Sequence, residues 1–318
     1  MRDAPPKPST LRARSESGPS ASVRTPFFLA LVVDGALAGA IYALIALAFV
    51  VVYKASRMTN FALGEWMMVG AGLVAAGVHG FRLGLAGALV AACAGMTLLA
   101  LAFNRVVLRR LLGRPLISVI MVTLGLGALL RGAASVALSG IPRRIPLPIP
   151  AEPIAVHGLL LSPEKLVAAA IATGVIALVA WFFTWSRSGV ALRAIADDQQ
   201  AAMAMGIDLE RYFALTWIMV GVIAVLAGTL WTFAAGSGFG VVLLGLKVFP
   251  IVIIGGLDSI PGTIVGAVAI GVLESVAAGY LDPWVGAGLS NVAPYLVLIA
   301  VLFARPCGLF GRADVVRV

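Results

Sequence analysis

Long apolar runs recur along almost the whole chain, and they limit its fold more than any other feature. Runs of about 18 to 28 residues are long enough for α-helices to cross the hydrocarbon layer of a membrane. The stretch Gly35–Val52 is representative, since it carries no charged side chain and shows no alternation of apolar and polar residues. Transmembrane β-strands would alternate in that way. The sequence therefore predicts an all-α membrane protein, a polytopic bundle of transmembrane helices.

The composition excludes a water-soluble globule. Hydrophobic residues make up 61% of the 318 residues and charged residues only 12%, whereas about a quarter of the residues in soluble domains are charged. The net charge of +9 comes from basic residues scattered between apolar runs, which fits membrane topology better than a nucleic-acid-binding face. Cys93 and Cys307 show neither a metal-ligand spacing nor a disulfide framework. We therefore expect contact with the lipid bilayer and none with nucleic acid.

The apolar runs predict about eight to ten membrane segments. The nine candidates cover residues 27–53, 61–79, 84–104, 117–138, 166–185, 212–235, 241–257, 263–281 and 291–304. Splitting the long first run in two would give ten crossings. The region 241–281 is ambiguous because glycines and a proline interrupt it, which indicates either a tight hairpin or a re-entrant break. The interrupting residues are Gly255, Gly256, Pro261 and Gly262.

Three regions are expected along the chain. Residues 1–25 are rich in Pro, Ser and Arg and have few large apolar side chains, so they predict a disordered N-terminal tail. Residues 26–311 form the predicted transmembrane domain, and residues 312–318 form a short cytoplasmic tail.

Basic residues in the short loops set the predicted orientation, because cytoplasmic loops are enriched in Lys and Arg. With nine crossings, four groups fall on one side: Lys54 and Arg57; Arg105, Arg109, Arg110 and Arg114; Arg187, Arg193 and Arg211; and Arg305, Arg312 and Arg317. Lys165 and the proline-rich loop 139–165 then lie outside, where the loop is expected to form an extended cap. The basic N-terminal tail would also lie outside, against the same rule, and ten crossings would remove that conflict.

A polar segment between two apolar runs, Ser188–Arg211, predicts a cytoplasmic surface helix. Its residues favour helix from position 190 to 205, and Gly206 suits the position after the last turn. Asp208 is expected to cap the next helix. Part of the segment is apolar, namely Ala201, Ala202, Met203 and Met205. A free connector does not need such a face, so we expect a docking site for a soluble partner.

Four ionisable residues lie at membrane depth, where an unpaired charge is expensive. They are Asp34, Glu65, Lys247 and Glu274. Asp34 and Lys247 lie near segment ends and can reach the interface. Glu65 and Glu274 lie deeper, so they are expected to face the bundle interior or an aqueous cavity on the translocation path. Structural pairing, for example with Asn60 or a helix end, is an equal alternative.

Two small-xxx-small motifs predict close helix packing: GALAG at Gly35–Gly39 and GTIVG at Gly262–Gly266. No P-loop motif is present, so the chain is not expected to bind ATP in that way and depends on another source of energy. The two histidines, His79 and His157, form no zinc-protease motif. Intramembrane carboxylates are few, which disfavours a proton-driven carrier.

Four blocks of the chain, in order and spread over residues 35–311, resemble the high-affinity branched-chain amino-acid ABC permeases, specifically the Liv H-type subunit. They read GALAGAIYALIALAFVVVYKASRMTNFALGEWMMVGA, RSGVALRAIADDQQAAMAMGID with RYFALTW, GLKVFPIVIIGGLDSIPGTIVGAVAIGVLES, and YLVLIAVLFARPCGLFG. Two positions depart from the family pattern. Leu63 replaces a histidine, and Gln200 replaces the glutamate of the loop that contacts the ATPase.

The resemblance implies an ABC-importer permease in the bacterial inner membrane. Its partners would be a second, Liv M-like permease, two cytoplasmic ATPases and a periplasmic binding protein. ATP would be bound by the ATPases, and no cofactor by this chain. The loop that couples to the ATPase would include Arg193, Asp197, Asp198, Gln200, Ala201, Ala202 and Gly206. Branched-chain amino acids are the implied substrates; urea, short amides or aromatic acids are alternatives within the family. An ion-coupled carrier and a membrane enzyme are remote alternatives.

Overall fold

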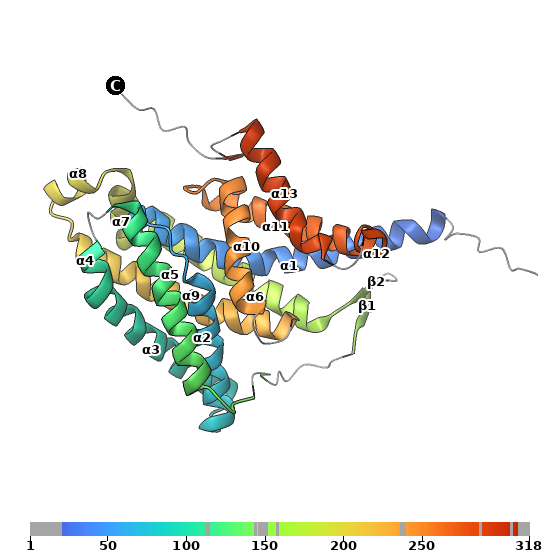
Figure 1. Cartoon of the computed structure of the whole chain (residues 1–318), viewed down its shortest axis with the longest axis horizontal. Coiled ribbons are helices and arrows are strands. Elements are labelled where there is room, and N and C mark those ends of the chain that lie inside the picture. Colours follow the sequence, from blue (N-terminus) through green and yellow to red (C-terminus); the bar gives the residue numbers. More distant parts are fainter. Residues whose placement is uncertain are drawn as a thin grey trace, which may run out of the picture.

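The computed structural model describes residues 21–111, 115–142, 145, 152–156, 159–235, 240–285, 288–305 and 308–310. This part of the chain is helical (Figure 1) apart from one antiparallel hairpin, β1 (Ile154–Val156) and β2 (Leu159–Leu161). The predicted all-α fold is therefore confirmed. The tails 1–20 and 312–318 lie outside the described residues, as does much of the proline-rich loop, whose described end forms the hairpin.

The helices follow one another with short connections. The first half of the chain holds α1 (Ala21–Ser56), α2 (Leu63–Ala75), η1 (Ala76–Gly80), α3 (Leu85–Phe103), η2 (Asn104–Leu108), α4 (Arg109–Leu111) and α5 (Leu116–Ala137). The second half holds α6 (Pro163–Trp185), α7 (Arg187–Asp197), α8 (Gln199–Ala204), α9 (Leu209–Ala235), α10 (Gly240–Gly255), α11 (Ile260–Tyr280), α12 (Asp282–Val285) and α13 (Leu289–Ala304).

Within the described residues, six helical stretches are long and apolar enough to cross a membrane. They are Phe27–Ser56, Leu85–Leu111, Ile117–Ala137, Pro163–Trp185, Leu209–Ala234 and Ile260–Tyr280. Val241–Gly255 and Leu289–Ala304 are apolar but shorter, and at 1.5 Å per residue they span about 22 and about 24 Å, less than the hydrocarbon layer of about 30 Å. All nine predicted segments are helical, whereas nine complete crossings remain a prediction.

α1 is the central helix of the bundle. It packs against α11, α9, α6 and α10, and every residue from Ile41 to Val52 is buried. A helix that is apolar on all sides can be buried on all sides in this way. By contrast, α3 and α5 expose many apolar side chains, including Val90, Leu98 and Leu129. These two helices therefore lie at the periphery, where lipid or a partner subunit can cover them.

The small-xxx-small motifs are helix contacts, as predicted. A Cβ added at Gly39 would lie 2.7 Å from the Cα of Val268, so α1 and α11 approach each other closely at this point. A Cβ at Gly266 would lie 2.9 Å from the carbonyl oxygen of Ile251 on α10. Both spacings leave no room for a larger side chain, which explains the glycines.

The start of the chain departs from prediction in two respects. α1 is a single helix of 36 residues, so splitting the first segment to give ten crossings is wrong. The two glycines of this helix, Gly35 and Gly39, do not interrupt it. They allow close packing against α11. The helix also begins at Ala21, inside the predicted tail 1–25, since residues 21–25 extend the helix by rather more than one turn.

A tight turn joins α10 to α11 at the residues that interrupt this region. Gly256 adopts a left-handed conformation with φ of 99°, which glycine accepts without steric cost. Ser259 then caps α11 by accepting a hydrogen bond from the backbone N–H of Gly262 at 3.1 Å. The interrupting glycines and proline therefore form a hairpin turn, and Pro261 occupies the first turn of the following helix, where proline is favoured.

Candidate functional site

The bundle has two chemically different ends. The loop end holds the C-terminus of α1, helices α7 and α8, and the α10–α11 turn. The cavity end holds the N-terminal half of α1 and the start of α6 and α13. Figure 1 shows α7 and α8 near one end of α1, with α12 and the hairpin near the other. Members of three of the basic groups predicted to share one side lie at the loop end: Arg57 contacts Ala196 and Asp258, Arg109 pairs with Glu210, and Arg193 lines a cavity beside Arg57. Arg114, Arg312 and Arg317 lie outside the described residues.

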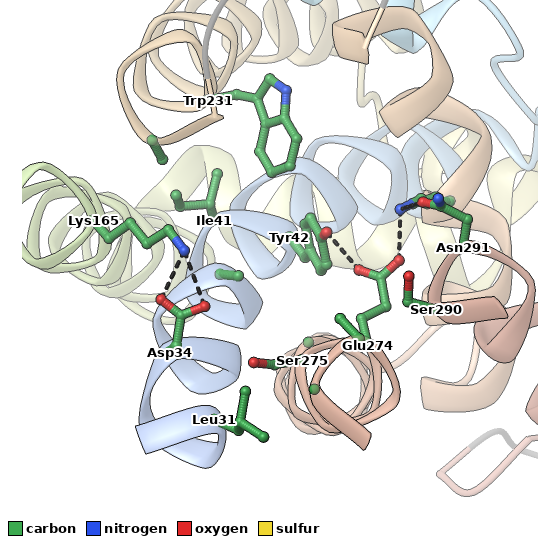
Figure 2. Close-up of a pocket in the computed structure, with 16 residues that line it drawn as sticks. Leu31, Asp34, Ile41, Tyr42, Lys165, Trp231, Glu274, Ser275, Ser290 and Asn291 are labelled. Carbon is green, nitrogen blue, oxygen red and sulfur yellow. Dashed lines mark hydrogen bonds and ion pairs between the residues drawn. The ribbon is translucent and has the colours of Figure 1, made fainter. Parts of the chain in front are cut away.

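A cavity of about 590 Å³ lies at the cavity end and is lined by α1, α6, α9, α10, α11 and α13 (Figure 2). Part of its wall is apolar, including Leu31, Ile41 and Trp231. The volume lies within the roughly 300–1,000 Å³ that small-molecule sites occupy. Two ion pairs also line it, so the cavity offers both apolar surface and paired charges to a small molecule.

The first ion pair joins Lys247 of α10 to Glu274 of α11, with 2.5 Å between Nζ and Oε1. The Tyr42 hydroxyl donates to the other oxygen of Glu274 at 2.6 Å, and Nζ of Lys247 also donates to Oδ1 of Asn291 at 3.0 Å. The Lys247 and Glu274 side chains are only 17% and 12% exposed, where an isolated charge is costly. Four helices therefore contribute to this Lys247–Glu274 cluster.

The second ion pair joins Lys165, at the start of α6, to Asp34 of α1. Nζ of Lys165 lies 2.7 and 2.9 Å from the two carboxylate oxygens (Figure 2). The side chains are 30% and 42% exposed, respectively. Asp34 was predicted to lie near an interface, and its exposure fits that position, but sequence reasoning did not identify Lys165 as its partner.

Asp282 fixes the start of α13 beside the cavity. Its carboxylate accepts hydrogen bonds from the hydroxyl of Ser290 at 2.8 Å and from the backbone N–H of Ser290 at 3.0 Å. These hydrogen bonds lower the pKa of Asp282. Because Asn291 follows Ser290 directly, this anchor also holds the Asn291 amide next to Lys247.

Glu65 does not pair with Asn60, which corrects the example given from the sequence. Glu65 is 5% exposed and pairs with Arg131 of α5. Gly127 allows α5 to approach, since a Cβ there would lie 3.1 Å from the Glu65 carboxyl carbon. Asn60 instead accepts a hydrogen bond from the backbone N–H of Ala62 at 3.0 Å, so its oxygen is committed to the start of α2. Neither residue lines the cavity.

At the loop end, Arg57 bridges three segments. It adopts a left-handed backbone conformation with φ of 54°, lies 3.1 Å from the Asp258 carboxylate and donates to the carbonyl of Ala196 at 2.9 Å. Partial burial opposes the guanidinium charge, but Asp258 and Tyr53 outweigh it and raise the pKa of Arg57. A second cavity of about 660 Å³ borders this bridge. Arg57 therefore connects α7 to the α10–α11 turn and to α1.

The predicted surface helix is two helices, because α7 ends at Asp197 and α8 begins at Gln199. Asp198 lies between them in an extended conformation, and its side chain accepts hydrogen bonds from the backbone N–H groups of Gln200 and Ala201 at 2.8 and 3.0 Å. An N-cap of this kind stabilises a new helix start and breaks the preceding one.

The end of this segment follows prediction. Gly206 has a φ of 82°, and Asp208 caps α9 by accepting from the N–H of Glu210 at 3.0 Å. Ala202 is buried, whereas Met203 and Met205 are 53% and 83% exposed. Two large apolar side chains therefore remain uncovered on this surface. Gln200 and Ala201 are exposed beside them, as are Arg193, Asp197 and Asp198.

Sequence reasoning missed several residues of these polar contacts, among them Tyr42, Arg131 and Asn291. Arg131 had a usable signal, because it is a charge inside an apolar run and every such charge needs a partner. Tyr42 and Asn291 had none, since both residue types are common near helix ends and interfaces. Among the described residues, no three His, Cys, Asp or Glu side chains come together to hold a metal ion.

Several apolar membrane-length helices, a charged internal cavity and a helical loop at the opposite end define a multi-pass membrane protein of the transport class. The chain belongs to the family described as the permease component of branched-chain amino acid transport systems, whose model matches residues 31–303. It is accordingly a transport permease subunit and a multi-pass inner-membrane protein.

Individual relatives agree with this family. The high-affinity branched-chain amino acid transport system permease protein LivH of Escherichia coli K12 is 28% identical over 310 residues, covering 92% of this chain and 98% of LivH. The corresponding protein BraD of Pseudomonas aeruginosa is 28% identical over 309 residues, with the same coverage. Among solved structures, PsaBC from Streptococcus pneumoniae in complex with Fab has a TM-score of 0.45 at 17% identity, covering 89% of this chain and 93% of that one.

Proposed function

We propose that this chain is one of two pore-forming permease subunits of an ABC importer that carries leucine, isoleucine and valine across the bacterial inner membrane. The observation that carries the proposal is the family match over residues 31–303. The names of the relatives, branched-chain amino acid transport system permease proteins, support the substrate class.

The partners in this proposal are a Liv M-like permease, two ATPases that bind and hydrolyse ATP, and a periplasmic binding protein. The ATPases dock at the α7–α8 segment, and the chain itself binds no cofactor. The exposed Met203 and Met205 side chains support that docking site, since neighbouring exposed apolar side chains commonly mark a contact surface for a partner.

In the proposed cycle, closure of the ATPases pushes on α7 and α8, and the push reaches α1 and the α10–α11 turn through the Arg57 bridge. The two permeases then change between outward-open and inward-open states. The cavity between α1, α10 and α11 supports this part of the proposal, because it places paired charges and apolar surface together among the helices that would move.

Reconstitution tests the proposal. The complete transporter, with the binding protein supplied outside proteoliposomes and ATP inside, should accumulate radiolabelled leucine, isoleucine and valine. Uptake of urea, a short amide or an aromatic acid in their place would redirect the substrate assignment. Uptake driven by an ion gradient without ATP, by this chain alone, would overturn the proposal in favour of a secondary carrier.

A further inference from the structure

The Lys247–Glu274 cluster has unused hydrogen-bonding capacity inside a cavity. An ammonium group has three donors, and Lys247 uses two of them, on Glu274 and Asn291. The amide nitrogen of Asn291 has no partner among the residues that the structure describes, and a carboxylate such as Glu274 can accept about four hydrogen bonds. The cluster therefore offers free donors and free acceptors within one cavity.

Stability alone does not explain this pair. Replacing a buried ion pair by apolar residues of similar volume is often neutral or stabilising, because the charges lose their hydration. The chain nevertheless holds Lys247 and Glu274 in a cavity wall and adds two neutral polar partners, Tyr42 and Asn291. A ligand that completes the hydrogen bonds of both charges is a chemical reason for this arrangement.

We propose that the Lys247–Glu274 cluster binds the charged groups of a zwitterionic α-amino acid during its passage through this subunit. The ligand carboxylate accepts hydrogen bonds from Lys247 and the Asn291 amide, and the ligand ammonium group donates to Glu274. The apolar side chain lies against the apolar part of the cavity lining that includes Ile41 and Trp231 (Figure 2). This inference rests on the proposed function and specifies how the substrate is recognised within the permease.

Charge balance decides which ligands fit. Both the empty cluster and the cluster with a zwitterion contain equal positive and negative charge, so binding leaves no charge uncompensated. A simple carboxylate would compete with Glu274 for Lys247 and leave one negative charge in excess at a site with little exposure. An amine without a carboxylate would leave one positive charge in excess. The cluster therefore discriminates against ligands that carry only half of the zwitterion.

The test is made on the complete reconstituted transporter with the double variant Lys247→Gln/Glu274→Gln. This variant removes both charges together, so neither is left alone, and it keeps polar side chains of similar length. With saturating leucine-loaded binding protein, maximal uptake should fall at least about tenfold, because hydrogen bonds to charged groups each contribute appreciably to binding. The affinity of the binding protein for leucine, measured separately, stays unchanged.

The matched control is Glu65→Gln/Arg131→Gln, which removes another intramembrane ion pair that does not line the cavity. This control shows what the loss of a pair does to folding and assembly alone, read from the thermal midpoint and the yield of assembled complex. It should leave the relative potency of competing ligands unchanged.

Direct binding supplies a second readout. Radiolabelled leucine is titrated onto the purified transporter without binding protein, with leucine, isocaproate and leucinamide as competitors. In the unaltered transporter, leucine should compete at least about tenfold better than either half-charged analogue, and the double variant should lose that difference.

Wild-type uptake by an assembled double variant, or equal competition by the three ligands, would overturn the proposed site. Absence of ATP-dependent leucine uptake by the unaltered transporter would instead overturn the proposed function, and the site with it.

Discussion

The cavity end and the loop end of the bundle use charge in opposite ways. At the cavity end, Lys247 and Glu274 are nearly buried and are joined to Tyr42 and Asn291 across four helices. At the loop end, the Arg57–Asp258 pair is about 40% exposed on each side. The Lys247–Glu274 cluster therefore holds charges that must balance each other at low exposure, whereas the loop end presents charges and apolar side chains to its surroundings. The contrast implies different responses to mutation, since buried pairs cost more to break than exposed ones.

The largest effect on folding is expected for the single substitution Glu274→Gln. It leaves the Lys247 ammonium in a low-exposure site without its carboxylate, and breaking a buried pair in this way costs about 3–5 kcal/mol. Thermal unfolding of the detergent-solubilised complex measures the loss. The double variant Lys247→Gln/Glu274→Gln should recover most of it, because no lone charge remains. A single variant as stable as the double one would contradict the view that these charges balance each other.

The second-largest effect is expected for Ala202→Glu at the loop end, where the substitution should act on transport and on the ATP hydrolysis coupled to it. Ala202 is 4% exposed, so a carboxylate there either loses its hydration or displaces α8, at a cost of several kcal/mol to the local structure. We expect normal membrane insertion but loss of both leucine uptake and the ATP hydrolysis linked to it. Gly206→Glu should act in the same direction, because φ at this position is 82° and a side chain is strained there.

The control for Ala202→Glu is Ala204→Glu, since Ala204 lies in the same helix and is exposed. It adds the same charge without burying it, so α8 should keep its place. Normal uptake and normal transport-linked ATP hydrolysis in the Ala202→Glu variant would contradict the hypothesis that the position of α8 controls coupling.

Removal of the cap at Asp198 is expected to have a smaller effect. Asp198→Ala leaves the N–H groups of Gln200 and Ala201 without their acceptor, which costs about 1 kcal/mol in comparable helices. Because the cap separates α7 from α8, its loss favours one longer helix and moves the exposed methionines. Transport-coupled ATP hydrolysis should fall severalfold, while Asp197→Ala, which removes a neighbouring carboxylate that does not cap α8, should change it little.

The helices were predictable from sequence, whereas their partners were not. Each apolar run became a helix because segment length and hydropathy are local properties that the sequence shows directly. The two glycine motifs are also local patterns, and they correctly predicted close helix contacts. The break at Asp198 was missed because alanine and glutamine on both sides favour helix strongly. The carboxylate competes with that preference only when it binds the backbone two and three residues ahead.

Long-range pairing limited the prediction of the site. Lys247 and Glu274 were both identified as intramembrane charges, but their pairing depends on the tight turn at Gly256, which places α10 against α11. Asn60, a neighbour in sequence, was named as an example of a partner for Glu65, although the actual partner, Arg131, lies on another helix. Partner choice follows from how the helices pack, and a single sequence contains no direct signal for it.

The smallest effect on stability, and the sharpest separation of the two ends, is expected for Arg57→Gly. Glycine adopts the left-handed conformation freely, which relieves about 1–2 kcal/mol of backbone strain. Loss of the exposed ion pair costs about 0.2–1 kcal/mol, and loss of the hydrogen bond to Ala196 costs about 0.5–1.5 kcal/mol. The thermal midpoint should therefore change little. Transport should nevertheless weaken severalfold, because the bridge from Ala196 to Asp258 is lost.

Arg57→Lys is the control, since it keeps the charge but cannot bind both partners with one planar group, and an intermediate coupling is expected. A stable Arg57→Gly transporter with full coupling would mean that the exposed bridge transmits nothing, and that α7 acts on the bundle only through its buried face.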